Sequence, residues 1–352
     1  MALMFTLLPL YYTDNYYNIL HDKRDVYELF SGILLAVVAA TLLISLILTI
    51  RHHRLKENVW QEIRRISMLD ILMVVSGIVA IVSTVYSADV AQAVSGEAAW
   101  DVGALTIVLS VVIYFVISRC YSGKGDIWAY LYFGSFAVLA IGIIDRLGYD
   151  FLVMHDEIPL QYNIFISTIG NVGFWASYLS MLIPFFMLLP VVVQSRWKSF
   201  FIYLYLLAAY FSLFITLTNT TYLGVGVASL FIIWYSLAKV ERLPNLAING
   251  ILFSVAGAVA EFLWKHPSYL LRPIDTDDVS WVLLQHRLYV LPGIVGVLLI
   301  LYLLILRRLP ERIQQKLDYF VEQIMTKIWI ELIIIGVVGV VYYLIYNYNL
   351  RI

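Results

Sequence analysis

This sequence has few charged residues and almost no cysteine. Only 13% of its 352 residues are Asp, Glu, Lys or Arg, and 62% are hydrophobic, whereas a soluble domain carries about 25% charged residues. A chain this apolar cannot be solvated as a globule in water, so a lipid bilayer is its expected solvent. The single cysteine, Cys120, excludes an intramolecular disulfide and a cysteine-based metal site.

Several functional signatures are also absent from the sequence. The net charge of −1 argues neither for nor against a nucleic-acid partner, and no basic patch with interleaved aromatics is present. There is no phosphate-binding loop, nucleophile elbow, zinc signature or dinucleotide fingerprint. We therefore expect no nucleic acid, no metal and no cofactor.

The apolar residues form about ten stretches of membrane-spanning length, which predicts an all-α polytopic membrane bundle with an additional short N-terminal apolar segment. We treat residues 1–352 as a single membrane domain. The predicted spans are Phe30–Ile50, Ile66–Ser87, Val102–Ser118, Ile127–Ile144, Gly173–Val193, Phe200–Thr216, Thr221–Ala238, Ala247–Trp264, Leu288–Leu306 and Ile328–Tyr348.

Positive charge alternates along these spans and orients them. Sixteen of the 23 Lys and Arg residues fall in every second gap, beginning with Arg51–Arg65 and ending with Arg307–Lys327. By the positive-inside rule these gaps face the cytoplasm, which predicts a plasma (inner) membrane protein. Within Arg307–Lys327, apolar residues recur every three to four positions, which predicts an amphipathic helix on the inner leaflet.

The first candidate site is at the outer end of the fourth span, where Asp145, Arg146 and Asp150 precede His155. A guanidinium is well shaped for bidentate oxyanion binding, so Arg146 is a candidate diphosphate ligand. The alternative is an exposed helix end with local ion pairs, and a loop histidine such as His155 is usually solvated.

The second candidate site is the stretch Ser167–Gly173, just before an inward-running span. Asn171 and its neighbours can cap that helix, and the same free amides can hold an anion. Thr216–Gly224 forms a further outer hairpin tip, with a cluster of hydroxyl and amide side chains that is also typical of turns.

The third candidate site comprises cationic residues around the last long outer segment, where a lipid headgroup would lie. These candidates for diphosphate binding are Lys265, His266, Arg272 and Arg287. The acidic run around Asp275–Asp278 lacks calcium-loop spacing and is better interpreted as a solvated loop.

Two stretches resemble the O-antigen ligase and O-antigen polymerase family of membrane glycan transferases. In one, Ile144–Asp150 is followed by Ile166–Tyr178 and Pro184, similar to the family's helix end, Ser-Thr-x-Gly-Asn-x-Asn turn and long helix. The other is the Leu8–Leu10 start with Lys23. Gly173 replaces the second Asn of the turn, and Thr218–Thr220 replaces the Ser-Arg-Gly found in many members.

The resemblance implies a metal-independent glycosyltransferase that moves glycan from a polyprenyl-diphosphate donor to an acceptor on the extracytoplasmic side of a bacterial plasma membrane. Membrane lipids and other glycan-assembly proteins would be its partners. The family's large external catalytic loop would follow Tyr348, where this sequence ends, so we expect a truncated or divergent member and leave catalysis by this chain open.

Two other functions compete with this one. A polysaccharide or lipid transporter (flippase) would need mid-depth charges or paired interrupted helices, and the spans display almost none of these. A non-catalytic membrane scaffold would fit the composition equally well.

Overall fold

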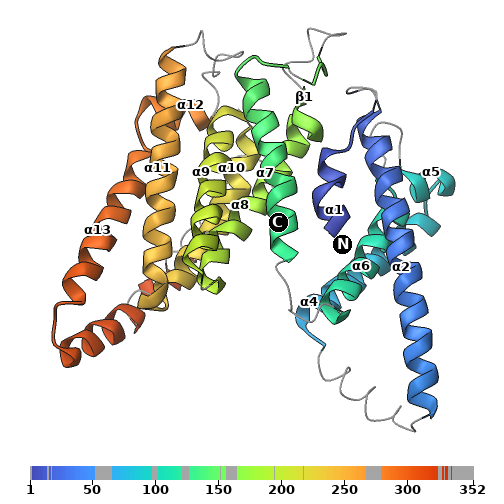
Figure 1. Cartoon of the computed structure of the whole chain (residues 1–352), viewed down its shortest axis with the longest axis horizontal. Coiled ribbons are helices and arrows are strands. Elements are labelled where there is room, and N and C mark those ends of the chain that lie inside the picture. The colour runs from blue at the N-terminus through green and yellow to red at the C-terminus, as the bar shows by residue number, and fades with distance from the viewer. Residues whose placement is uncertain are drawn as a thin grey trace, which may run out of the picture. The chain divides into compact units, whose positions relative to one another are not determined.

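The computed structural model describes residues 2–13, 16, 18–51, 66–96, 102–120, 127–150, 152–155, 165–193, 195–216, 218–266, 279–323, 327–328, 330–331 and 334. Across these residues the fold is all-α with one two-stranded sheet (Figure 1). Seven helices are long and apolar enough to cross a membrane. The chain is therefore a multi-pass membrane protein.

The chain divides into two compact units, which are described separately. Unit 1 comprises residues 1–138 and 150–170, and unit 2 comprises residues 139–149 and 171–352. Unit 1 contains α1 (Ala2–Thr6), η1 (Leu8–Leu10), α2 (Ile19–Arg51), α4 (Met68–Val85), α5 (Val90–Ser95), α6 (Ala104–Cys120), the first part of α7 (Ile127–Arg146), β1 (Phe165–Ile166) and η3 (Ser167–Ile169).

Unit 2 contains the end of α7 and the helices that follow the sheet. These are α8 (Val172–Val192), α9 (Arg196–Thr216), α10 (Asn219–Leu237), η4 (Val240–Arg242), α11 (Leu243–Lys265), α12 (Val279–Gln285) and α13 (Val290–Leu306). The strand β2 (Gly170–Asn171) leads into α8 and pairs with β1.

Most predicted spans coincide with helices to within a few residues. The seven helices that meet the length and hydropathy requirements are α2, α4, α7, α8, α9, α10 and α11. The third predicted span is α6, whose 17 residues reach only about 25 Å. The ninth is α13, which forms a pair with α12 bent by 62°, and most of the tenth lies outside the described residues.

In unit 1 the short N-terminal apolar segment folds as α1 and η1 and packs beside α7. A Cβ at Gly134 would lie 2.3 Å from the carbonyl oxygen of Phe5, so only glycine permits this approach. The Lys23 ammonium donates to the carbonyls of Leu8, Pro9 and Tyr11 at 2.8–3.1 Å. Lys23 thereby satisfies the free carbonyls at the end of η1 and links this segment to α2.

Asp70 joins α4 to α6 through a buried polar cluster. Its carboxylate accepts hydrogen bonds from the backbone of Ser67, from Tyr114 Oη at 2.8 Å and from Arg119 Nη2 at 2.8 Å. Asp70 is 2% exposed, so the neutralising Arg119 is what permits its burial.

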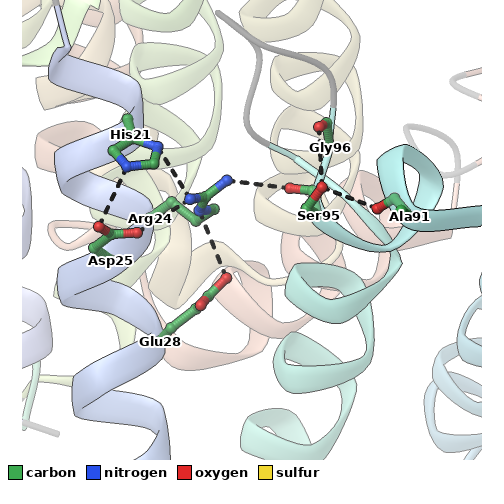
Figure 2. A network of polar contacts seen from close by, with 7 residues as sticks. All are labelled: His21, Arg24, Asp25, Glu28, Ala91, Ser95 and Gly96. Carbon is green, nitrogen blue, oxygen red and sulfur yellow. Dashed lines mark hydrogen bonds and ion pairs between the residues drawn. The ribbon is translucent and has the colours of Figure 1, made fainter.

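Figure 2 shows a second polar contact of unit 1, centred on Arg24 of α2. Its guanidinium meets Asp25, Glu28 and His21 on its own helix, and it donates to the carbonyl of Ser95 at the end of α5. These contacts dock α5 against α2. They also occupy the guanidinium of Arg24, which makes it a poor candidate for diphosphate binding.

Unit 2 has a well-buried core around α9, with Trp175, Phe186 and Tyr205 fully enclosed. Small residues bring α11 and α13 close together, since a Cβ at Gly250 would lie 2.4 Å from the Pro292 carbonyl oxygen and one at Gly296 would lie 2.5 Å from the Ala247 carbonyl oxygen.

A buried pair of asparagines connects three helices of unit 2. Asn245 Nδ2 donates to the Met187 carbonyl of α8 at 2.7 Å, and Tyr210 Oη of α9 donates to Asn249 Oδ1 at 3.0 Å. Both asparagines lie on α11. In a membrane such hydrogen bonds link helices that hydrophobicity alone would not hold in register.

After α13 the chain forms a further helix over residues 311–323, drawn in red at the lower left of Figure 1, where it runs across the direction of α13. Leu309 and Leu317 are half-buried there, while Ile313 and Phe320 are exposed. The predicted helix is therefore present over this range, and its location on the inner leaflet stays a prediction.

Candidate functional site

Arg146 is the last residue of α7 and is buried, with only 5% of its surface exposed. Its Nη2 lies 3.4 Å from the carbonyl oxygen of Thr216, at the end of α9. The helix end at Arg146 is therefore not exposed, contrary to that part of the alternative interpretation. A charged side chain held inside a helical bundle is costly, so it is usually retained for function or for a specific contact.

Asn171 begins α8 and caps it, as one of the two sequence interpretations predicted. Its Oδ1 accepts the Gly173 amide at 2.7 Å, which satisfies one of the free amides of the first turn. One turn further along α8, Trp175 Nε1 donates to Thr216 Oγ1 at 2.8 Å. Thr216 is thus the residue where the ends of α7, α8 and α9 meet.

The third candidate site gathers around one carboxylate, Glu261 of α11. Its oxygens accept from Lys265, from Tyr289 Oη and, at 3.2 Å, from Arg287 Nε. Glu261 is 8% exposed, whereas Arg287 is largely exposed and Lys265 is half exposed in its side chain. Two cations and one anion leave a net charge of +1, and the two cations are the more exposed members of the cluster.

Arg287 owes its position to a bend in the chain. Arg287 lies between α12 and α13 and adopts a φ of +51°, a conformation that non-glycine residues rarely take. At the same bend the Tyr289 ring packs against Gly257 of α11. A Cβ at Gly257 would lie only 2.5 Å from that ring. Contact with α11 therefore fixes the backbone that presents Arg287.

Aromatic rings connect this Glu261 cluster to Arg146. The Phe214 and Tyr289 ring centroids are 6.4 Å apart, and Phe214 lies two residues before Thr216, the partner of Arg146. Arg146, Arg287 and Lys265 are therefore grouped at the same end of unit 2. That they share one cavity with Asn171 stays a prediction.

The remaining candidates have different surroundings. His266 ends α11 as an exposed residue, with Nδ1 2.8 Å from the Phe262 carbonyl oxygen. Arg272 and the acidic run Asp275–Asp278 lie outside the described residues. Among the residues that the structure does describe, no three His, Cys, Asp or Glu side chains are grouped to hold a metal ion.

In unit 1, His155 is buried and not solvated, contrary to the expectation for a loop histidine. It is 1% exposed, its Nε2 lies 3.3 Å from Tyr16 Oη, and Asp150 accepts its backbone amide at 2.7 Å. Tyr16 also donates to the Ser167 carbonyl at 3.1 Å. This cluster holds the Ser167–Thr168 turn, which explains why it can carry a positive φ at Ser167.

No protein-family model, curated protein or solved structure matches this chain. The chemistry of the site therefore has to be judged from its own residues. The cations of Arg146, Lys265 and Arg287, grouped at one end of unit 2, are a set of donors of the kind that binds an oxyanion.

Glu261 and Tyr289 were not among the predicted residues of the third candidate site, which were the cations Lys265, His266, Arg272 and Arg287. The spacing of Glu261 and Lys265, four residues apart on one helix, was a usable signal for an ion pair. The contribution of Tyr289 depends on the bend before α13, which the apolar pattern does not reveal.

Proposed function

We propose that this protein is an O-antigen ligase- or polymerase-like membrane glycosyltransferase. It would have about ten spans and lie in the plasma membrane of a bacterium. On the extracytoplasmic side it would move glycan from a polyprenyl-diphosphate donor to an acceptor, alongside other glycan-assembly proteins. The resemblance in Ile144–Asp150 and Ile166–Tyr178 supports this proposal.

The observation that carries the proposal is the position of Arg146. It is a buried guanidinium at the end of α7, and it contacts Thr216 at the same end of unit 2 as Lys265 and Arg287. A diphosphate leaving group gains negative charge as its bond to the sugar breaks. Fixed cations placed at that point would stabilise the transition state more than the ground state.

In the proposed reaction an acceptor hydroxyl attacks the anomeric carbon of the donor, and the bond from that carbon to the diphosphate oxygen breaks. The electron pair leaves with the diphosphate, and the hydroxyl proton passes to a base that we do not assign. Arg146 binds the departing diphosphate with its paired donors, while Arg287 and Lys265 add positive charge at the headgroup level.

The test compares Arg146→Lys with wild type, using purified full-length protein in lipid nanodiscs and a polyprenyl-diphosphate-linked oligosaccharide. Lysine keeps the charge but loses the bidentate fork, so release of polyprenyl diphosphate should fall by about 10²–10³-fold, as for the loss of one oxyanion donor. Arg308→Lys, at an exposed position after α13, is the matched control. An unchanged release rate in Arg146→Lys would remove the proposal's main support.

A lipid or polysaccharide flippase is the second candidate, and one observation favours it. The bent pair of α12 and α13 is an interrupted helix of the kind that builds transport sites, contrary to the sequence-based argument. Movement of a fluorescent lipid-linked glycan across proteoliposomes, without loss of its diphosphate, would favour this function over glycan transfer.

A further inference from the structure

Unit 2 contains a cavity of about 500 Å³, most of whose lining comes from α10, α11 and α13. Its lining residues include Tyr222 and Gly226 of α10, Asn249 and Phe253 of α11, and Leu291 and Val295 of α13. Gly226, Leu291 and Val295 are also exposed on the surface of the unit, so the cavity opens sideways between α10 and α13. In a membrane this opening faces lipid.

The interior of the cavity offers almost only hydrocarbon. Four polar side chains line it, and each already has a protein partner. Tyr210 Oη bonds Asn249 Oδ1, Tyr222 Oη bonds Ser280, Asn249 Nδ2 donates to the Asn245 carbonyl, and Ser229 lies 4.0 Å from the Met187 sulfur. A sugar or phosphate would lose its hydration there without compensation, whereas an apolar chain would not.

The cavity lies directly below the cationic end of unit 2. Phe253 and Tyr222, at its outer end, both pack against Phe214, with ring centroids 5.0 and 6.3 Å apart. Phe214 in turn contacts Tyr289, which binds Glu261, and precedes Thr216, which contacts Arg146. One layer of aromatic rings therefore separates the apolar cavity from the charged groups.

Its depth corresponds to one leaflet. From Tyr222 to Ile233, both lining residues on α10, the helix rises about 16 Å, which is about half of the roughly 30 Å hydrocarbon core. A lipid with its head at the cationic end would thus extend its chain along the cavity without crossing the midplane.

We infer that this cavity holds the first part of the prenyl chain of a polyprenyl-diphosphate donor, with the diphosphate at the Arg146 and Arg287 end. The inference rests on the proposed function for the identity of the lipid. The geometry adds that the donor enters sideways from the outer leaflet, between α10 and α13, and that the chain is held inside the protein while the head reacts.

Two exposed helix glycines provide a matched test. A Cβ at Gly226 or at Gly32 would meet nothing within 4 Å, so each position has open space where a side chain would begin. Gly226 lines the cavity, whereas Gly32 lies on α2 in unit 1. Gly226→Leu should therefore block the cavity, and Gly32→Leu should not.

The measurement is the Kd of the full-length protein for farnesyl diphosphate, a short prenyl probe, and separately for inorganic diphosphate. Gly226→Leu should weaken the binding of farnesyl diphosphate by about tenfold or more and leave the Kd for inorganic diphosphate unchanged. Gly32→Leu should change neither Kd. Val295→Trp, which blocks the same opening from α13, should reproduce the effect if Gly226→Leu folds poorly.

The outcomes separate this inference from the proposed function. Wild-type affinity of both blocking variants for farnesyl diphosphate would overturn the inference. Displacement of that probe by an equal concentration of phosphatidylglycerol would also overturn it, because the cavity would then bind ordinary membrane lipid. If the blocking variants lose prenyl affinity while Arg146→Lys releases diphosphate normally, the cavity assignment stands and the glycosyltransferase proposal fails.

Discussion

At the scale of single residues, Lys23 allows a sharp test. Its three hydrogen bonds to the Leu8, Pro9 and Tyr11 carbonyls should stabilise the α1–η1 segment by about 1–3 kcal/mol. Lys23→Met should therefore accelerate hydrogen exchange of the amides in residues 7–11 by tenfold or more, measured by mass spectrometry. Lys239→Met removes an exposed lysine and is the control.

The Lys23 prediction has a clear contrary result. If the amides of residues 7–11 exchange as slowly in Lys23→Met as in wild type, the ammonium does not hold the segment. In that case the close packing against Gly134 would be sufficient to retain α1.

The candidate residues were recognisable from the sequence, but their surroundings were not. Arg146 and His155 were recognisable as polar residues at a helix end and in a loop, yet both are buried. Burial depends on which helix ends meet, such as Thr216 against Arg146. A pattern along one chain cannot specify contacts between residues 70 or more positions apart, whereas the local Asn171 cap needed only neighbouring residues.

At the scale of elements, hydropathy located the long helices because each needs a continuous apolar stretch. The short elements α5, α12 and η3 were not predicted. They depend on individual contacts, such as Arg24 with the Ser95 carbonyl or Tyr222 with Ser280. The bend before α13 was missed for the same reason, since a positive φ at Arg287 leaves no mark on an apolar pattern.

At this scale we predict how the contact between α4 and α6 contributes to stability. Asp70→Asn should destabilise the protein by about 1–3 kcal/mol, because Tyr114 and the partly exposed Arg119 would lose a charged hydrogen-bond partner. The measurement is thermal unfolding in detergent. Asp89→Asn is the control, because Asp89 caps α5 at an exposed position and asparagine caps equally well.

A double variant completes this test. Asp70→Asn combined with Arg119→Met removes both charges and should recover part of the lost stability. If Asp70→Asn unfolds at the wild-type temperature, the cluster does not join α4 to α6.

At the scale of the whole molecule, charge alternation predicts which side each helix end faces. The Cys120 end of α6 and the helix over 311–323 should face the cytoplasm, while Arg146 and Lys265 face outward. Cys120 is the single cysteine, so it reports topology without engineering. A membrane-impermeant maleimide should leave Cys120 unlabelled in intact cells and label it after lysis.

The control for topology is a cysteine at Asp277 in a Cys120→Ser background, which should react in intact cells. Labelling of Cys120 in intact cells would show that the orientation is the opposite of the predicted one. The cationic end of unit 2 would then face the cytoplasm. A donor on the extracytoplasmic side could not reach it.

The lengths of the membrane helices have a consequence for the bilayer itself. The 18 residues of α4 rise about 27 Å, whereas the 21 residues of α8 and of α9 rise about 31 Å. Hydrocarbon about 30 Å thick matches α8 and α9 and exceeds α4. Lipids next to α4 should therefore compress by a few Å, so a slightly thinner membrane should suit this helix better.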